Sequence, residues 1–242
     1  MFAYKEKAPE DIPETELNRA GVIKCGGGDD LYGDNSGTSL SIIGADFCVV
    51  ASDTRHSAPY NINTRHATKS FCLDGRFILS TTGFYADSRF VYTELAYQID
   101  KYQFKYNKKM GIEQAAALLH VLLYKHRFFP KFTYCCLVGF NEEEKPKIFS
   151  YDPVGSYQET PCRCNGSGTT MLQPMLDSWI TRKNWHCEEG KDYVCTEEEV
   201  ISLVKDVFNS VAETDVKTGD GLEVYVIKKD GITREEYPLR SD

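Results

Sequence analysis

The order in which strand and helix patterns follow one another is the feature that most restricts how this chain can fold. A block of strand patterns is followed by two helical stretches, a second strand block, two more helical stretches and a final pair of strands. Blocks of strands and helices, as opposed to single alternating units, are typical of α+β folds. We therefore predict a four-layer αββα sandwich, in which two mainly antiparallel sheets face each other between outer layers of helices.

The strand predictions rest on short runs rich in β-branched, aromatic and other apolar residues. Gly44 and Ala45 separate the first two runs, which predicts a hairpin. An acidic turn at residues 141–146 joins a later pair. The predicted strands cover residues 38–43, 46–52, 76–82, 132–140, 147–152, 222–229 and 232–239.

Helices are predicted where apolar residues recur with a period near 3.6. Gly111 separates the first two helical stretches. The third covers residues 169–183 and contains Pro174, which strains a helix interior. Thr196 and Glu199 form a capping box at the start of the fourth stretch.

Length and composition indicate one large domain preceded by an extension. The chain has 242 residues, of which 41% are hydrophobic, and this is enough for one sizeable core and too much for a disordered chain. Residues 1–36 are instead rich in charge, proline and glycine, so we assign them to an N-terminal, propeptide-like extension and residues 37–242 to the folded domain.

The longest apolar run, residues 115–124, is too short to span a membrane. The N-terminus lacks the apolar region of a secretory signal, and we expect the nine cysteines to stay reduced.

Charge and motif content argue against several classes of partner and cofactor. Lysine and arginine number 28 against 36 aspartate and glutamate residues, and a net charge of −8 disfavours generic nucleic-acid binding. No glycine-rich phosphate loop follows a predicted strand, so we expect no nucleotide cofactor. Zinc-ligand residue types do occur, but their spacing is not that of a zinc ribbon or finger, and we expect no metal. They are Cys162, Cys164, His186, Cys187 and Cys195.

A few polar residues stand out by their position in the predicted elements. Asp53 ends a strongly apolar strand, where a carboxylate needs a partner. Asp215 lies at or just beyond the C-terminus of a capped helix, which is the unfavourable end for an anion. Each residue alone is typical of a structural ion or a turn. Their combination with Lys69, Ser167 and Thr218 forms a more specific pattern.

That pattern resembles the proteasome beta-subunit family. The strand VVASD (49–53) is followed after fifteen intervening residues by Lys69, and then by Gly83 and Asp87, which matches the spaced signature of the family. The resemblance covers essentially all of residues 37–242. It implies the N-terminal-nucleophile hydrolase fold, an αββα sandwich like the one predicted above.

Other segments resemble one particular member of the family, a subunit without catalytic activity at the sixth position of its ring. These segments are residues 51–55, 126–130, 151–158, 171–177, 204–208 and 215–220.

The resemblance also implies roles for individual residues. Active members use an N-terminal threonine as the nucleophile and its own α-amine as the base, a group whose pKa lies near neutral pH. A lysine lowers the pKa of that nucleophile, and an aspartate orients the lysine. By position, Lys69 and Asp53 match these two groups. Ser167, Asp215 and Thr218 match the network around the terminal amine, with Thr218 where active members usually have serine.

The spacing departs from that of active members at the nucleophile itself. In active members the aspartate lies sixteen residues after the threonine and the lysine thirty-two. Counted from Thr38, Asp53 and Lys69 are fifteen and thirty-one residues away, whereas counted from Gly37 both distances fit. Gly37 therefore occupies the nucleophile slot, and Thr38 lies one residue further, where a strand side chain points to the opposite face. Ser36 also stands where active members have glycine.

We therefore expect a non-catalytic structural subunit of the 20S proteasome core, with Gly37, Asp53, Lys69, Ser167, Asp215 and Thr218 as a vestigial site. The resemblance implies other beta subunits of the same ring, alpha-ring subunits and the opposing beta ring as partners. It also implies a location in cytoplasm and nucleus, and a part in ubiquitin-dependent and ubiquitin-independent protein degradation. We expect no membrane or nucleic-acid partner.

Two alternatives stay open. In the first, a cut between Gly37 and Thr38 makes Thr38 the nucleophile of an active threonine endopeptidase. In the second, the chain is a free-standing amidase or binding protein on the same sandwich.

Overall fold

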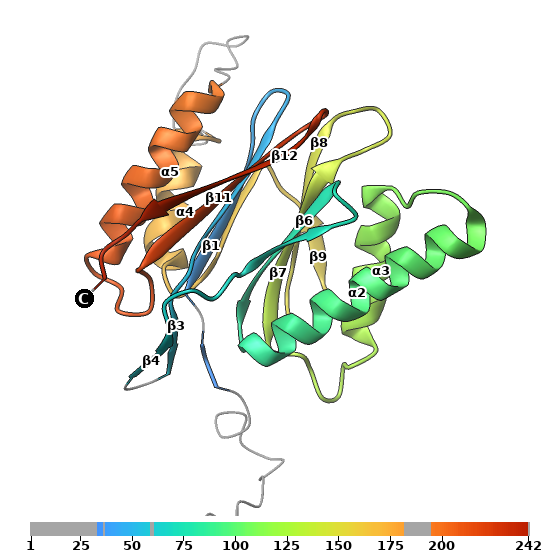
Figure 1. Ribbon diagram of the computed structural model, residues 1–242, viewed down its shortest axis with the longest axis horizontal. Helices are drawn as coiled ribbons and strands as arrows, with labels where there is room; N and C mark the ends of the chain where they lie inside the picture. The colour runs from blue at the N-terminus through green and yellow to red at the C-terminus, as the bar shows by residue number, and fades with distance from the viewer. Residues whose placement is uncertain (1–32, 36, 59–60, 182–194, 242) are drawn as a thin grey trace, which may run out of the picture. The chain divides into compact units, whose positions relative to one another are not determined.

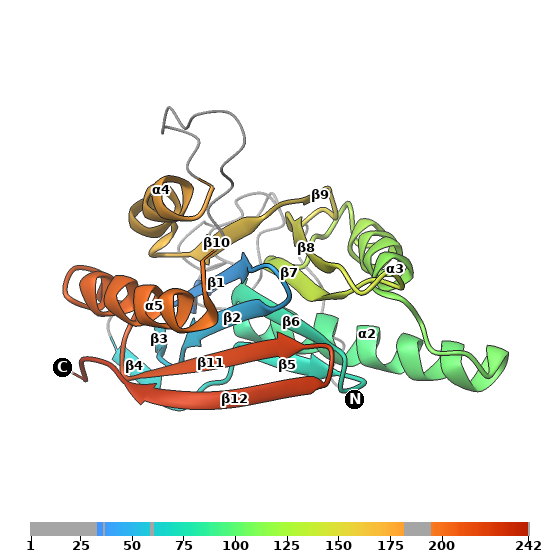
Figure 2. The same ribbon diagram turned by 90° about the horizontal axis from the view of Figure 1, so that it is seen from above.

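The computed structural model describes residues 33–35, 37–58, 61–181 and 195–241. Within these residues two five-stranded sheets lie face to face (Figures 1 and 2). Every strand pairing in them is antiparallel. The first sheet has the spatial order β10 (Cys162–Gly166), β1 (Thr38–Ile43), β2 (Cys48–Asp53), β11 (Gly221–Lys228) and β12 (Gly231–Pro238).

The second sheet is built from the middle of the chain. A separate antiparallel pair of strands, β3 (His56–Ala58) and β4 (Asn61–Thr64), comes between β2 and β5 in the sequence. The second sheet has the spatial order β5 (Ser70–Leu73), β6 (Phe77–Gly83), β7 (Thr133–Phe140), β8 (Pro146–Tyr151) and β9 (Tyr157–Glu159).

Helices cover the outer face of each sheet, as Figure 2 shows most directly. Helices α4 (Thr169–Trp179) and α5 (Glu197–Ala212) pack on the first sheet, where they share a buried apolar cluster with it. Helices α2 (Tyr85–Tyr106) and α3 (Ile112–Tyr124) share a second cluster with the other sheet. A third cluster lies between the sheets. Three apolar layers between four structural layers confirm the predicted αββα sandwich.

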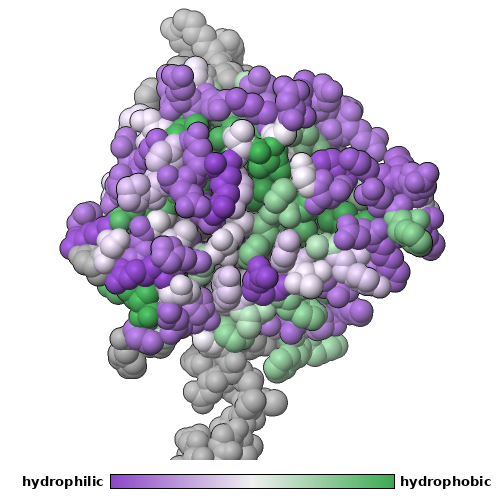
Figure 3. All heavy atoms as spheres, in the orientation of Figure 1, coloured by the Kyte–Doolittle hydropathy of each residue, from purple (hydrophilic) through white to green (hydrophobic). Residues whose placement is uncertain are grey.

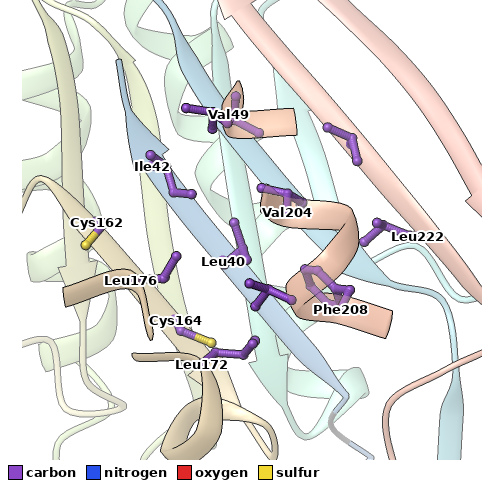
Figure 4. Packing of buried hydrophobic residues seen from close by; sticks show 14 of the residues in the cluster. Leu40, Ile42, Val49, Cys162, Cys164, Leu172, Leu176, Val204, Phe208 and Leu222 are labelled. Atoms are coloured by element: carbon purple, nitrogen blue, oxygen red, sulfur yellow. The ribbon is translucent and has the colours of Figure 1, made fainter. Parts of the chain in front are cut away.

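The alternation of side chains along β1 explains how one strand serves two layers. Leu40 and Ile42 are fully buried in the cluster under α4 and α5, where Leu172 and Phe208 meet them (Figure 4). Residues one position out of phase, such as Ser41, point to the other sheet instead. Burying large apolar side chains on one face holds the register, because a slip of one residue would exchange the faces.

The capping box at the start of α5 is present as predicted. The Thr196 hydroxyl accepts a hydrogen bond from the Glu199 backbone N–H, and the Glu199 carboxylate accepts one from the Thr196 backbone N–H at 2.9 Å. Two otherwise unpaired donors at the helix end are thereby satisfied. This helix carries the chain to the loop that contains Asp215 and Thr218.

Strands β3, β4, β5, β9 and β10 were not predicted from the sequence. Four of them are short or largely exposed, and β10 has the sequence CRCNG, whose asparagine and glycine are typical of turns. The third helix was predicted to reach residue 183 but ends at Trp179. The predicted extension (1–36) falls almost wholly outside the described residues, as do His186 and Cys187.

The described surface is mostly polar. Figure 3 shows hydrophilic residues over most of the face seen in Figure 1, with a hydrophobic band through its middle. Among the described residues, no helix is both long and apolar enough to cross a membrane.

Candidate functional site

All the residues predicted for the vestigial site meet at one end of the first sheet. Gly37 immediately precedes β1, which begins at Thr38; Asp53 ends β2, and Lys69 immediately precedes β5. Two loops complete the site, one that follows β10 and carries Ser167, and one that follows α5. The second loop contributes Asp215 and Thr218. Because β1 and β2 are antiparallel neighbours, the first residue of one strand and the last of the other necessarily lie close together.

The Asp53 carboxylate is the centre of the site. It is completely buried and accepts three hydrogen bonds. Its Oδ1 accepts from Lys69 Nζ and from the Thr38 backbone N–H, both at 2.8 Å, and its Oδ2 accepts from the Gly219 N–H at 3.2 Å. Burial raises the pKa of the Asp53 carboxyl, and the Lys69 ammonium and the two backbone donors offset part of that rise.

The Lys69 ammonium uses all its hydrogen-bonding capacity within the chain. An ammonium group has three N–H donors and no acceptor. Those of Lys69 reach Asp53 Oδ1 at 2.8 Å, the Asp53 carbonyl at 2.9 Å and the Arg55 carbonyl at 2.7 Å. The side chain is only 3% exposed. No donor therefore remains for a nucleophile or a substrate unless one of these bonds breaks.

Gly37 has no room for a side chain. A Cβ atom at this position would lie 2.1 Å from Asp53 Oδ1 and 2.3 Å from Asp53 Oδ2, far inside van der Waals contact. The space that a nucleophile's Cβ and hydroxyl would need is thus filled by the carboxylate that pairs with Lys69. The sequence predicted that the hydroxyl is missing, but not that its place is taken.

Thr38 is held away from the Asp53–Lys69 pair on the opposite side of the strand. Its hydroxyl is buried, lies 2.7 Å from the Thr218 hydroxyl and accepts a hydrogen bond from the Gly168 N–H at 2.9 Å. Its nitrogen is part of the peptide bond to Gly37 and donates to Asp53. The side chain of Thr38 therefore joins the start of β1 to two loops.

The remaining predicted residues, Ser167, Asp215 and Thr218, form a hydrogen-bonded group next to the Gly37 carbonyl. Asp215 Oδ2 accepts hydrogen bonds from the hydroxyls of Ser167 at 2.5 Å and Thr218 at 2.6 Å. The Ser167 N–H donates to the Gly37 carbonyl at 3.1 Å. Gly166, with φ of +100°, passes so close that a Cβ there would lie 2.0 Å from the Gly37 carbonyl oxygen. This position therefore requires glycine.

A second buried ion pair lies beside the site and was not predicted. Arg55 Nε contacts Asp220 Oδ2 at 2.9 Å, and the two side chains are 4% and 3% exposed. The Arg55 Nη1 also donates to the Val216 carbonyl at 2.8 Å, and Arg65 forms a further ion pair with Asp220. Burial acts to raise the pKa of Asp220, but hydrogen bonds from Arg55 and Arg65 hold it below its ordinary value.

Both residues of this second pair lie in segments already noted for their family resemblance, 51–55 and 215–220. The only clue to this ion pair in the sequence was an arginine shortly after Asp53 and an aspartate shortly after Thr218. Their pairing links the β2–β3 connection to the loop after α5.

No metal cluster accompanies the site within the part of the chain that the structure describes. There, no group of three or more histidine, cysteine, aspartate and glutamate residues could hold a metal ion. Cys162 and Cys164 are buried under α4, and burial raises the pKa of the Cys164 thiol. His186 and Cys187, named with them above, lie outside the described residues. Chemically, the arrangement is a closed set of charges and hydroxyls that joins two strands and two loops.

Comparison with known proteins assigns this chain to one family. The family described as "Proteasome subunit" matches residues 34–227. The chain belongs to the proteasome beta-subunit family.

Individual relatives narrow the resemblance further. The chain is 47% identical over 213 residues to a probable proteasome subunit beta type-6 of Encephalitozoon cuniculi, covering 88% of this chain and 71% of that protein. It is 41% identical over 211 residues to proteasome subunit beta type-1 of Danio rerio, covering 87% and 88%. It is 39% identical over 220 residues to proteasome subunit beta type-6 of Saccharomyces cerevisiae, covering 87% and 90%. The segments named above resemble beta type-1, and these relatives confirm that likeness.

Proposed function

We propose that this chain is a non-catalytic subunit in the beta ring of the 20S proteasome core. It fills one place in the ring, contacts neighbouring beta subunits, the alpha ring and the opposing beta ring, and helps to enclose the chamber in which sibling subunits cleave proteins. Relatives named beta type-1 and type-6 support this assignment. The same proposal places the chain in cytoplasm and nucleus, where it serves ubiquitin-dependent and ubiquitin-independent degradation.

One observation carries the non-catalytic part of the proposal. Gly37 stands in the nucleophile slot, and the Asp53 carboxylate lies where its Cβ would be, at 2.1 Å. A lysine can assist a nucleophile only if it can reach it, and all three donors of Lys69 are bound to Asp53 and Arg55. The residues of the site are therefore retained for structure, because leaving one buried charge without its partner costs about 3–5 kcal/mol.

The alternative is a threonine endopeptidase in which Thr38 becomes the N-terminal residue. The adjacency of Gly37 and Thr38 favours it, as does the polar network around the Thr38 hydroxyl. Against it, that hydroxyl is buried between Thr218 and Gly168 and has no hydrogen bond to Lys69. A cut before Thr38 would also have to begin with the hydroxyl that those contacts hold.

The decisive experiment is intact-mass analysis and N-terminal sequencing of the subunit within its purified native particle. We expect a chain that begins at or before Gly37 and is not labelled by reagents that capture N-terminal threonines. Sibling subunits in the same sample that begin with threonine provide the positive control for the labelling. A mature chain that begins at Thr38 and is labelled would overturn the proposal.

The native mass of the particle distinguishes a ring subunit from a free-standing amidase or binding protein. A free-standing amidase or binding protein would migrate as a small species, whereas a ring subunit is recovered only with other proteasome subunits. We expect this chain to co-purify with beta and alpha subunits at a constant ratio.

A further inference from the structure

The layer between the two sheets has an apolar part and a polar part. The apolar part is the third cluster, in which Val50, Val138 and Tyr225 meet from opposite sheets. The polar part is formed by the facing sides of β1, β6 and β10. Among the described residues, buried polar atoms that lack a hydrogen-bond partner gather here, and they include the hydroxyls of Ser39, Ser80 and Thr82 and the Nε of Arg163.

Arg163 is the charged member of this polar part. Its neighbours in β10, Cys162 and Cys164, are buried under α4, so alternation along the strand directs Arg163 to the opposite face, toward the second sheet. Its register partner on β1 is Ser41, whose side chain also faces that sheet. Among the described residues, the Arg163 guanidinium forms no ion pair and no hydrogen bond. By contrast, Lys69 uses all three of its donors, and Arg55 donates hydrogen bonds to Asp220, Val216 and Arg240.

Two cavities meet at Arg163. One has a volume of about 240 Å³ and is lined by Ser150, Asp152 and Tyr157, and the other has a volume of about 320 Å³ and is lined by Thr82, Asn165 and Ser167. Tyr134 and Arg163 line both cavities. The guanidinium thus forms a shared wall with open space on both sides.

Neither of the two acidic residues that line these cavities forms an ion pair with Arg163. Asp152 accepts hydrogen bonds from the backbone N–H groups of Val154 and Ser156, which form its own turn. Asp34, in the larger cavity, is exposed and pairs with Lys217. The described part of the chain therefore supplies a planar cation but no carboxylate to match it.

A partly buried guanidinium without an anion is costly, and a carboxylate is the group whose geometry matches its fork of donors. The rim of the cavities is aromatic, since Tyr134 and Tyr157 are 40% and 43% exposed. Arginine and tyrosine together are typical of the energetically dominant part of protein–protein interfaces. The site also lies at the outer edges of both sheets, where β9 and β10 have no further strand beside them among the residues that the structure describes.

We propose that the two cavities at Arg163 receive an aspartate or glutamate side chain from a neighbouring subunit, which forms a bidentate ion pair with the guanidinium. This inference rests on the proposed function, because it requires the chain to be part of a ring. It adds a specific contact residue and the chemistry of its partner. The aromatic rim favours a protein segment over a free anion, because a small solute would leave Tyr134 and Tyr157 exposed.

A cryo-electron microscopy structure of the native particle tests the proposal directly. We expect a carboxylate oxygen of another subunit at about 2.7–2.9 Å from the Arg163 guanidinium. Solvent alone, a free anion, a bound peptide or an acceptor from this same chain at that position would each overturn it. Such a result leaves the proposed function intact if the subunit is found in the ring with Gly37 unprocessed.

Variants provide an independent test in particles where they replace the wild-type subunit. We expect Arg163→Met to increase the rate at which particles dissociate in salt about tenfold or more, and Arg163→Lys to have a smaller effect, because lysine keeps the charge but loses the planar fork. Arg127→Met, at an exposed arginine beyond α3, is the matched control and should leave the rate unchanged. Equal dissociation rates for wild type and Arg163→Met would overturn the proposal.

A charge exchange makes the test specific. If the neighbour's acidic residue is replaced by arginine, the Arg163→Glu variant should restore the stability that either change alone removes. Failure of the exchange to restore it, with both variants incorporated, would argue against the ion pair.

Discussion

Two regions of this molecule contain a buried or partly buried basic side chain, and they differ in whether its hydrogen-bond donors are paired. At the Asp53–Lys69 pair, Lys69 gives all three of its donors to Asp53 and Arg55, and the Asp53 carboxylate accepts three hydrogen bonds. Between the sheets, Arg163 faces two cavities and finds no acceptor among the described residues. The first region satisfies its hydrogen bonds within one chain, whereas we propose that a neighbouring subunit completes the second.

This difference reverses what the residue types alone indicate. A lysine, two aspartates, a serine and two threonines at the end of a sheet have the composition of an active site, yet their bonds point to one another. A single arginine in a short strand has no such pattern, yet Arg163 has no hydrogen-bond partner among the described residues. Saturation of hydrogen bonds, which depends on tertiary contacts, therefore separates a structural cluster from a binding site more reliably than residue type does.

The largest expected effect comes from breaking the saturated pair. Lys69→Met leaves the Asp53 carboxylate buried without its counter-ion, so we expect the free energy of unfolding of the purified chain to fall by about 3–5 kcal/mol in urea denaturation. The double variant Asp53→Asn/Lys69→Met should recover much of this loss, because neither charge is then left unpaired. A loss below about 1 kcal/mol for Lys69→Met would show that the pair is not structural.

Restoring a threonine in the nucleophile slot should damage the site without activating it. In Gly37→Thr the new Cβ collides with the Asp53 carboxylate, and we expect a loss of about 1–3 kcal/mol in the free energy of unfolding. Gly37→Ala, which adds only the colliding carbon, is the size control and should account for most of that loss. In assembled particles, intact mass should show no cleavage before residue 37, since Lys69 has no donor to spare. A labelled mature chain beginning at residue 37 would contradict this.

The pH dependence of unfolding tests the second buried pair, Arg55–Asp220. The folded-state pKa of Asp220 lies below its ordinary value of 3.8, so the unfolded chain takes up the proton first as the pH falls. The stabilisation is present above that ordinary pKa and is lost as the pH drops toward the folded-state pKa. One carboxyl contributes at most about 1.4 kcal/mol per pH unit to this slope.

The measurement is urea unfolding of the purified chain between about pH 5 and pH 2.5. Asp220→Asn should flatten the slope below pH 4, whereas Asp100→Asn, at an exposed carboxyl of α2, should not. An unchanged slope in Asp220→Asn would mean that this ion pair does not contribute to acid sensitivity.

The smallest expected effect on stability is that of replacing Arg163. Arg163→Met removes a partly buried cation that has no ion pair or hydrogen bond among the described residues, so we expect the free energy of unfolding of the isolated chain not to fall, and to rise by no more than about 0.5 kcal/mol. The same replacement of a cation by methionine at Lys69 is expected to lower it by several times that amount. A large loss for Arg163→Met in the isolated chain would show that Arg163 is stabilised by groups within the chain.

Much of the architecture could be predicted from the sequence because its signals are local. The apolar runs that became β1, β2, β6, β7, β8, β11 and β12, and the capping box of α5, depend on neighbouring residues only. Strands such as β4, with the sequence NINT, and β10 carry weak or contrary local signals and exist because a partner strand pairs with them. Tertiary pairing overrides propensity in such segments.

The candidate site was predicted unevenly for the same reason. Asp53, Lys69, Ser167, Asp215 and Thr218 were identified through a resemblance in spacing, and the structure brings them together. The Arg55–Asp220 pair and the cavities at Arg163 were missed, because nothing in the local sequence shows which distant group a charged side chain meets.

Residue identity and spacing alone established the order of the elements, the resemblance to the family and the absence of a hydroxyl at position 37. The folded chain was needed to show that the Asp53 carboxylate fills the space beside Gly37, that Lys69 uses all three of its donors and that Arg163 has no hydrogen-bond partner among the described residues. Those outcomes depend on distances between different segments, which lie sixteen residues apart for Asp53 and Lys69 and more than a hundred for Ser41 and Arg163. Packing fixes such distances, and hydrogen bonds form or fail within a fraction of an ångström of them.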